Sequence, residues 1–527
     1  MKNYQWLDHL IGIIPTSAQG DKLSMFSIAL EGWRRGLTLK FINVKFLNSI
    51  EVSYSLSDGV KEHKFAVSKG DKVTQEGMRI GKSKELTKKY LKEAGVPVPD
   101  GKSFDAGTTI EDILKFAESI SYPVVLKPTN GNLGKGVIAN IKSENELKEA
   151  IHYVREELKY EKVICERFIS GEEYRIYVID DKVIGATNRI PANVIGDGKS
   201  SIRILIQQKN NERKKNPNLS NRPIKIDKEL TKRLKENKLT LEYIPKKDER
   251  IFLSDKSNLS SGGDPIDATD ILTPEMKVAA INAAKAAKMV QCGVDMIIDS
   301  KNNHYAVLEL NSRPGIGAHL FPMEGNARDI PKAIIDYYFP ESKSSTDKSL
   351  LYFDFDKIFN LLRSGAADEV TVPTSPKETV VSKQFIFYGK VQGVGYRKWL
   401  QRRAVNLRIH GFAENKKRGE LSVVVAGTKK QLEEFVAIIH ADKPSKAIVD
   451  GIDELSWDCP VKVGFEILTE KVNQQNLESK YKEEQSKLKK IKKDYEKVKK
   501  QLKAIEKSKI WIYTSPLRKI VRKIKRV

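Results

Sequence analysis

Two carboxylates and one amide stand out in the segment VDMIIDSKNNHYAVLELNSRPG, residues 294–315. The segment reads as two paired strands, with Asp295 at the start of the first and Glu309 and Asn311 at the end of the second. Residues two apart in a strand face the same side, so Glu309 and Asn311 share a face. With Asp295 they form an all-oxygen set that suits Mg²⁺, or Mn²⁺, bridging nucleotide phosphates. The alternative is a solvated strand end with incidental acids.

A glycine-rich loop follows a short apolar strand in the segment PVVLKPTNGNLGKGV, residues 123–137. The strand ends in Lys127, and the loop contains Gly131, Gly134 and Gly136. Glycines let backbone N–H groups close on phosphate oxygens, and lysine adds positive charge. The segment predicts a phosphate-binding loop, and the alternative is an ordinary surface loop.

A third segment, VICERFISGEEYRI, reads as a strand that ends at Glu166 and turns at Ser170 and Gly171. Such a hinge suits a purine bound through the backbone and a ribose bound through a carboxylate. By itself the segment is unremarkable and is better explained as a plain strand and turn.

A second group of chemical residues lies near the other end of the chain, in QFIFYGKVQGVGYR, residues 384–397. A strand runs into a glycine-rich loop, and Arg397 then opens a helix through Ala404. A helix N-terminus after such a loop binds anions, and arginine adds a bidentate phosphate donor. The next segment, 410–427, reads as a hairpin with Asn415 at its turn, where an amide could hold an attacking water.

These residues need alternating helices and strands to position them. The apolar spacing predicts helices over 24–35, 83–95, 110–120, 144–158 and 274–290, and strands over 37–44, 123–127, 162–168, 174–179, 294–298 and 305–310. Residues 207–250 are polar and rich in Lys, Arg and Asn, which predicts an inserted or mobile segment.

In this order, the first three segments resemble the ATP-grasp superfamily of carboxylate–amine ligases. The resemblance covers about residues 80–340 and is strongest to the ATP-grasp modules of cyanophycin synthetases and bifunctional glutathione synthetases. It is carried by KELTKKYLKEAGVPVP (84–99), PANVIGDGKSSI (191–202), IPKKDERIFLSDKSNLSSGGDPID (244–267) and ELNSRPGIGAHLFPMEGNARDI (309–330). It implies a ligase that uses ATP and Mg²⁺ to convert a carboxylate into an acyl phosphate, which an amine then attacks.

The resemblance also implies roles for single residues. Lys84 and Lys127 match the lysines that hold the nucleotide phosphates, and Asp295, Glu309 and Asn311 match the metal ligands. The remaining implied roles are the adenine hinge at Glu166, Phe168 and Ile169, the ribose acid at Glu173, and a cation for the acyl phosphate or substrate carboxylate at Arg313.

One departure leaves a catalytic cation unassigned. D-alanine ligases place an arginine two residues before the first metal acid, and here that position is Gly293. Arg175, Arg189 or Arg250 could substitute, and the sequence does not choose among them.

Residues 383–468 closely resemble acylphosphatase, a small ferredoxin-like domain. In that family the loop backbone and an arginine bind phosphate while an asparagine positions water, and these roles fall on Arg397 and Asn415. A degenerate domain retained for packing is the alternative.

The composition bears on the charge distribution and on the cellular compartment. The chain has 527 residues and a net charge of +24, of which residues 471–527 carry +14 from 20 Lys/Arg and 6 Asp/Glu. The three cysteines have neither metal nor disulfide spacing, and no secretory signal or apolar run of membrane-spanning length occurs, which predicts a cytoplasmic protein. The basic excess needs no nucleic-acid partner, because a solvated tail explains it.

The tail itself carries a pattern. Apolar residues between 477 and 505 alternate at spacings of four and three, apart from Glu484, which predicts a coiled coil and a homo-oligomer. Residues 517–527 are basic and amphipathic and could lie on the inner face of an anionic membrane, with a solvated tail as the alternative.

We therefore expect an α+β multidomain enzyme. Its expected parts are an N-terminal α/β unit (1–80), an ATP-grasp domain (81–340), a linker (341–382), a ferredoxin-like acylphosphatase domain (383–468) and a basic coiled-coil tail (469–527). The expected partners are a carboxylate, an amine such as an amino acid or peptide, and acyl phosphates. Two alternatives stay open: acylphosphatase as the only activity, or an envelope-associated scaffold gated by nucleotide.

Overall fold

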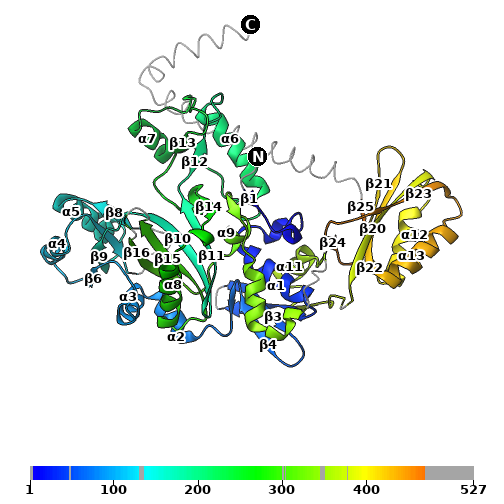
Figure 1. Ribbon diagram of the computed structural model, residues 1–527, viewed down its shortest axis with the longest axis horizontal. Coiled ribbons are helices and arrows are strands. Elements are labelled where there is room, and N and C mark those ends of the chain that lie inside the picture. The colour runs from blue at the N-terminus through cyan, green and yellow to red at the C-terminus, as the bar shows by residue number, and fades with distance from the viewer. Residues whose placement is uncertain are drawn as a thin grey trace, which may run out of the picture. The chain divides into compact units, whose positions relative to one another are not determined.

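The computed structural model describes residues 4–46, 49–129, 136–299, 302, 304–344, 350–376 and 378–468 (Figure 1). The chain forms two compact units, one of residues 1–381 and 458–463 and the other of 382–457 and 464 onward. The second unit thus differs from the expected range 383–468. The segment 458–463 belongs to the first unit because its strand β24 (Val461–Lys462) pairs with β18 (Leu351–Tyr352). The predicted coiled coil and tail lie outside the described residues.

The N-terminal part of the first unit is an antiparallel sheet packed on one buried helix. Its strand order is β19-β2-β3-β4-β5, and α1 (Leu23–Arg34) is buried along its whole length. The strands are β2 (Thr38–Phe46), β3 (Ser49–Ser57), β4 (Glu62–Ala66), β5 (Lys69–Gly70) and β19 (Glu369–Val372).

The expected linker is therefore wrong over much of its length. Residues 351–372 form β18, α11 (Phe355–Arg363) and β19, and β19 pairs with β2 at the edge of the N-terminal sheet. The physical reason is apolar burial: Phe353, Phe355 and Leu362 are at most 2% exposed. The rings of Phe353 and Phe355 pack on Phe26 and Phe41 of the N-terminal part.

Two antiparallel sheets carry the predicted nucleotide and metal residues. The smaller has the order β6-β9-β7-β8, with β6 (Gly101–Phe104), β7 (Val124–Pro128), β8 (Ile138–Ile141) and β9 (Val163–Arg167), and helices α4 (Ile110–Ser119) and α5 (Glu144–His152). The larger, the catalytic sheet, has the order β14-β11-β10-β15-β16, with β10 (Glu172–Ile179), β11 (Lys182–Ile190), β14 (Asp264–Asp267), β15 (Gln291–Asp299) and β16 (His304–Asn311).

Helices α2 (Gln75–Lys82), α3 (Lys84–Glu93) and α8 (Pro274–Ala286) pack on the catalytic sheet. Alanines on α8 are buried against β10 and β15, so the helix approaches the sheet closely. The short elements that follow the sheet are α9 (Gly317–Leu320), β17 (Gly325–Asn326) and α10 (Ile330–Tyr338), and β17 pairs with β1 (Tyr4–Gln5) from the start of the chain.

Residues 191–263 form a lobe inserted between the neighbouring strands β11 and β14. The lobe contains β12 (Asn193–Ile195), α6 (Ile202–Lys215), α7 (Lys228–Glu236) and β13 (Arg250–Phe252), which Figure 1 shows gathered beyond β14. Its apolar residues build a core of its own, including Ile202, Ile206 and Leu234. The segment is therefore a folded insertion, because its sparse Ile and Leu residues fall on the inner faces of two helices.

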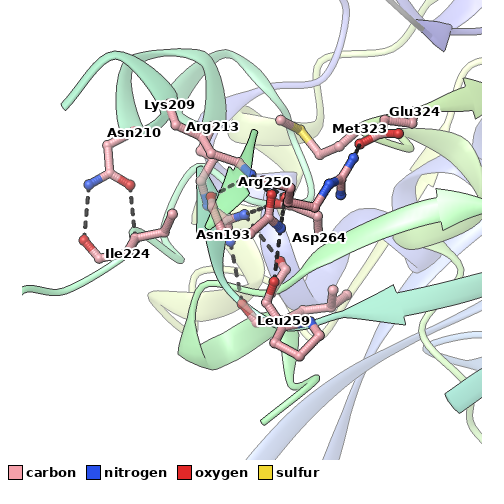
Figure 2. A network of polar contacts seen from close by, with 12 residues as sticks. Asn193, Lys209, Asn210, Arg213, Ile224, Arg250, Leu259, Asp264, Met323 and Glu324 are labelled. Carbon is pink, nitrogen blue, oxygen red and sulfur yellow. Dashed lines mark hydrogen bonds and ion pairs between the residues drawn. The ribbon is translucent and has the colours of Figure 1, made fainter. Parts of the chain in front are cut away.

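A buried polar network joins this lobe to the catalytic sheet (Figure 2). Asp264, at the start of β14, accepts a hydrogen bond of 2.6 Å from Arg213 and pairs with Lys209, both on α6. Asn193 donates to the same carboxylate at 3.1 Å. Arg213 and Asp264 are 1% and 2% exposed, so the network lies in the interior.

The second unit has a βαββαβ order followed by one more strand. Its sheet runs β23-β20-β22-β21-β25, formed by β20 (Val380–Lys390), β21 (His410–Asn415), β22 (Leu421–Thr428), β23 (Ile448–Ser456) and β25 (Phe465–Leu468). Helices α12 (Tyr396–Asn406) and α13 (Lys429–Ala441) contribute to a shared apolar core. Among the described residues, no helix has the length and apolarity needed to cross a membrane.

Candidate active sites

The three predicted metal ligands come together at one place on the catalytic sheet. Asp295 on β15 and Glu309 on β16 are register partners on adjacent strands. The Asn311 amide donates to Asp295 at 3.3 Å and to Glu309 at 3.4 Å. Asp295 is only 3% exposed, so this oxygen set lies at the bottom of the site.

The pKa values of the two carboxylates of this set are shifted in opposite directions. Burial would raise the pKa of Asp295, but Arg175 and Arg189 outweigh it and hold that pKa below its ordinary value. Burial and the neighbouring Asp295 raise the pKa of Glu309 above its ordinary value. A carboxylate that resists ionisation beside an ionised one, with an amide oxygen in reach, fits a divalent cation, which would favour the ionised form of both acids.

The structure places two arginines where the sequence left a gap. Arg175 on β10 donates two hydrogen bonds of 2.6 Å to Asp295, and Arg189 on β11 lies 3.9 Å from the same carboxylate. A Cβ atom added to Gly293 would lie 2.8 Å from Pro314 and 3.5 Å from the Arg175 Cδ, so Arg175 fills the space beside this glycine. Arg250, the third candidate, pairs instead with Glu324 at 2.8 Å.

A second cluster of charges lies between α3, β7 and β9. The Glu166 carboxylate, almost fully buried, pairs with Lys127 and accepts a 3.0 Å hydrogen bond from Lys88. Burial would raise the pKa of Glu166, but the two lysines lower it below its ordinary value. Lys84 borders the same small cavity of about 20 Å³, and its pKa is lowered by burial and by Lys127.

Lys88 is a residue that the sequence interpretation missed. It lies four residues after Lys84 on α3, one helical turn away, so both side chains reach the cavity that Lys127 and Glu166 also line. That i, i+4 spacing was the available signal.

The hinge and ribose candidates lie on the strand and turn where they were expected. Phe168 and Ile169 follow β9 and are half-buried, and the Phe168 N–H donates to the Pro123 carbonyl at 2.9 Å. Glu173 on β10 pairs with Arg189 at 3.0 Å and accepts a 2.6 Å bond from the Ser257 hydroxyl of the lobe. Ser257 is 84 residues away in the chain, and no sequence signal linked the two.

The remaining ATP-site candidates are less closely grouped. Arg313 is exposed and lies 4.0 Å from Glu51 on β3, so its described ion pair is with the N-terminal sheet rather than with the metal acids. Gly136 has a φ of 74°, where a side chain would be strained. Gly131 and Gly134 lie outside the described residues.

The second unit builds a glycine-rich loop before α12 (Tyr396–Asn406). Gly393 and Gly395 have φ values of 71° and 81°, which glycine adopts without strain, and an added Cβ would meet nothing within 4 Å at either position. The loop is tied to the β21–β22 turn because Gln392 donates to the carbonyls of Lys416 and Glu420, at 2.8 and 2.7 Å. Gln392 is a further positioning residue that the sequence interpretation missed.

The two expected hydrolytic residues flank this loop. Arg397 is the second residue of α12, and its guanidinium donates to the Leu468 carbonyl at 3.1 Å, which fixes one end of the group. The buried Asn415 Oδ1 at the end of β21 has no hydrogen-bond partner among the described residues. A buried amide oxygen without a partner is costly, and a bound water would satisfy it.

Comparison with known protein families separates the same two parts of the chain, the first unit and the second. Residues 83–189 match the carbamoyl-phosphate synthase L chain ATP-binding domain, residues 253–337 match the RimK-like ATP-grasp domain, and residues 383–467 match acylphosphatase.

Several known proteins are similar to the first unit. A glutathione biosynthesis bifunctional protein of Clostridium perfringens is 35% identical over 330 residues, 60% of this chain and 41% of that protein. A cyanophycin synthetase of Crocosphaera subtropica is 35% identical over 273 residues, 50% of this chain and 31% of that protein. The solved structure of a bifunctional glutathione synthetase from Pasteurella multocida is 29% identical with a TM-score of 0.45, and the match covers 55% of this chain and 41% of that chain.

This chain thus spans less than half the length of these relatives. The resemblances read from the sequence are confirmed by the family matches and the curated relatives. The chain contains an ATP-grasp ligase domain in its first unit and an acylphosphatase domain in its second.

Proposed function

We propose that the first unit is an ATP-dependent ligase that activates a carboxylate as an acyl phosphate and joins it to an amine, and that the second hydrolyses acyl phosphates. The observation that carries the ligase proposal is the Asp295–Glu309–Asn311 set, in which Asp295 is buried and bonded to Arg175. Few purely structural arrangements hold two adjacent carboxylates in a buried site with an arginine on one of them.

The nucleotide site follows from the same geometry. Lys84 and Lys127 would bind the phosphates, and Glu173 the ribose. Adenine would meet the backbone of Phe168 and Ile169. When Lys127 turns to a phosphate, Lys88 remains to neutralise the buried Glu166.

Mg²⁺ or Mn²⁺ would be held by Asp295, Glu309 and Asn311, and it would offset the negative charge of the nucleotide phosphates. Side chains of the protein would position the transferring phosphoryl group. Arg175 and Arg189 present positive charge next to the metal acids, where negative charge develops on the transferring phosphoryl group.

The proposed ligation has two steps. A substrate carboxylate oxygen bonds to the γ-phosphorus as the bond to the β–γ bridging oxygen breaks, which releases ADP. The amine then attacks the acyl carbon, loses a proton, and expels inorganic phosphate. Arg313 is a candidate to bind the substrate carboxylate, because it is exposed and lies beside the N-terminal sheet.

In the second unit, the loop N–H groups and Arg397 would bind the phosphoryl oxygens, and Asn415 would hold the water. That water attacks phosphorus, and the carboxylate leaves with the electron pair of the broken P–O bond. No metal is required in this scheme.

The tail proposals rest on sequence alone. The 477–505 repeat would form a coiled coil and make the chain a homo-oligomer. The basic end would hold this cytoplasmic protein at the inner face of the membrane. Sedimentation velocity and co-sedimentation with anionic vesicles test the two separately. A monomer that ignores vesicles would contradict both.

Two assays test the proposed activities. Purified protein is screened for ATP hydrolysis against amino acids and peptides, with Glu309→Ala expected to lower turnover at least about 100-fold. Benzoyl phosphate hydrolysis is measured for Arg397→Ala, expected to fall by a similar factor, with Arg402→Ala, an exposed neighbour on the same helix, as the matched control. Wild-type ATP turnover in Glu309→Ala, or equal losses in the two arginine variants, would contradict the assignment.

A further inference from the structure

A tight turn of the N-terminal sheet lies against the proposed ligase site. Strands β4 and β5 are joined by two residues, Val67 and Ser68. The Ser68 side chain is fully buried, and its hydroxyl donates to the Pro314 carbonyl at 2.7 Å. Pro314 lies three residues after the proposed metal ligand Asn311, so this hydrogen bond holds the turn beside the end of β16.

The turn is held in a conformation that its sequence does not favour. Val67 has a φ of 61°, where a β-branched side chain is strained, and hairpin turns usually place Gly, Asn or Asp at such a position. The buried Tyr54 hydroxyl donates to the Val67 carbonyl at 3.0 Å, and the Gln291 amide donates to the Ser68 carbonyl. Strain of this kind persists where the surrounding structure fixes it, and it gathers at functional sites. The turn thus gives the next residue, Lys69, a fixed place.

Three cations gather beside this turn. The Lys69 ammonium nitrogen lies 3.2 Å from the Met78 sulfur on α2. Lys82 follows Met78 by one helical turn on the same face of α2. Arg313 directly precedes Pro314, so the hydrogen bond from the turn to Pro314 brings Arg313 to the same place. We call Lys69, Lys82 and Arg313 the cation cluster.

The cation cluster has little negative charge around it. Among the described residues, neither Lys69 nor Lys82 has a carboxylate within 4.0 Å, and Arg313 reaches only the exposed Glu51, at 4.0 Å. Burial and Arg313 lower the pKa of the half-buried Lys69, Lys82 adds to them, and Asp71 offsets them only in part. Like charges held together repel one another, and a bound anion would relieve that repulsion.

The cation cluster adjoins the metal acids without belonging to them. A Cβ atom added to Gly81 would lie 3.3 Å from the Leu310 carbonyl, so the end of α2 packs against β16. Lys82 and Asn311 are the next residues on these two elements. Arg313 is two residues beyond Asn311, at most about 7 Å of extended chain. The reacting carboxylate has to meet the γ-phosphate at the metal acids, so an anion on the cation cluster is a second group of the same substrate.

We propose that Lys69, Lys82 and Arg313 bind a second, non-reacting carboxylate of the acid that the ligase activates, so that its donor substrate is a dicarboxylate. This inference rests on the proposed ligase function and names the class of acid that it uses. A nucleotide phosphate is the other anion that such charges could bind, but Lys84 and Lys127 already line the nucleotide cavity. The carboxylate of a diacid satisfies the cluster and leaves those lysines to the nucleotide.

Turnover of acids that differ by one charge tests the proposal. Glutarate is compared with glutaramate, and N-acetylglutamate with N-acetylglutamine and N-acetylisoglutamine, in an ATP-hydrolysis assay with hydroxylamine as the acceptor. We expect kcat/KM for each diacid to exceed that for its amides at least about tenfold.

Two variants of one lysine and a matched control locate the effect. Lys69→Gln is expected to raise the KM for the diacids about tenfold, with kcat and the KM for ATP within about twofold of wild type. Lys69→Arg, which keeps the charge, is expected to restore the KM. Lys64→Gln is the control, because Lys64 is an exposed lysine of the same hairpin. Circular dichroism verifies that each variant folds.

Three results would overturn the proposal: amides used as well as the diacids, equal effects of Lys69→Gln and Lys64→Gln, or a rise in the KM for ATP in place of that for the acid. Glu309→Ala separates this failure from failure of the ligase proposal. If Glu309→Ala abolishes turnover of a monocarboxylate that Lys69→Gln uses normally, the ligase stands and the cation cluster has no part in it. If wild type turns over no acid at all, the ligase proposal fails and this inference fails with it.

Discussion

Single charged groups in the ATP site are tuned by their immediate neighbours. Glu166 and Asp295 are both buried carboxylates whose pKa values lie below the ordinary range, because each is paired with cations. Glu309 is half-buried and faces Asp295, and its pKa is raised. Position relative to an arginine or lysine, rather than residue type, decides the direction in which the pKa of each carboxylate is shifted.

Lys88 gives a prediction at this scale. In Lys88→Met, nucleotide binding would draw Lys127 away from Glu166 and leave a buried carboxylate without a counterion. We expect the Kd for ATP to rise about tenfold or more, with Lys88→Arg close to wild type. Lys89→Met is the control, since Lys89 is exposed and its ion pair with Glu93, at 4.0 Å, lies at the surface. Wild-type affinity in Lys88→Met, measured by calorimetry, would refute this role.

At the scale of elements, the lobe depends on one buried carboxylate. Asp264→Asn would leave Arg213 and Lys209 without their buried counterion. We expect the free energy of unfolding to fall by about 3–5 kcal/mol, since breaking a buried ion pair strands a charge.

Asp255→Asn is the matched control for that change, because Asp255 pairs with Arg233 at the surface of the same lobe, and it should cost under about 1 kcal/mol. Urea unfolding measures both. Similar small effects would show that the buried network does not hold the lobe.

The segment after β16 contains a pH-sensitive group. His319 on α9 is 1% exposed and neither ring nitrogen has a described partner, and burial, with Arg175 and Arg189, lowers its pKa to about 3. Because the unfolded chain takes up the proton and the folded chain does not, stability is full above the unfolded pKa of about 6.5 and falls with pH below it.

His319→Gln removes that proton uptake. From pH 7 to 5 we expect the wild type to lose about 2 kcal/mol more unfolding free energy than the variant. Urea unfolding at the two pH values gives the difference. An identical pH dependence in the two proteins would mean that His319 is protonated in the folded state.

The sequence predicted elements whose signal is local and missed those that depend on distant partners. The helix expected over 110–120 is observed as Ile110–Ser119, and the metal acids meet across β15 and β16 as their strand pattern indicated. The edge strand β19 was assigned to a linker, because its partner β2 is more than 300 residues away. Arg175 was only one of three candidate cations, because sequence does not give the register of β10 on β15.

For the whole molecule, the two proposed activities act in opposite directions on one chemical species, an acyl phosphate. The ligase would form an acyl phosphate, and the acylphosphatase would consume any that escapes or forms on a wrong substrate. The central question is therefore whether this chain both makes an acyl phosphate and hydrolyses it.

Trapping that intermediate with hydroxylamine tests the claim most directly. Wild type, Glu309→Ala and Arg397→Ala are incubated with ATP, Mg²⁺, hydroxylamine and the carboxylate found in the ATP-hydrolysis screen, without another amine acceptor, and the hydroxamate is quantified by mass spectrometry. We predict several-fold more hydroxamate from Arg397→Ala than from wild type, and none from Glu309→Ala. Equal hydroxamate from wild type and Arg397→Ala, or undiminished hydroxamate from Glu309→Ala, would contradict the account.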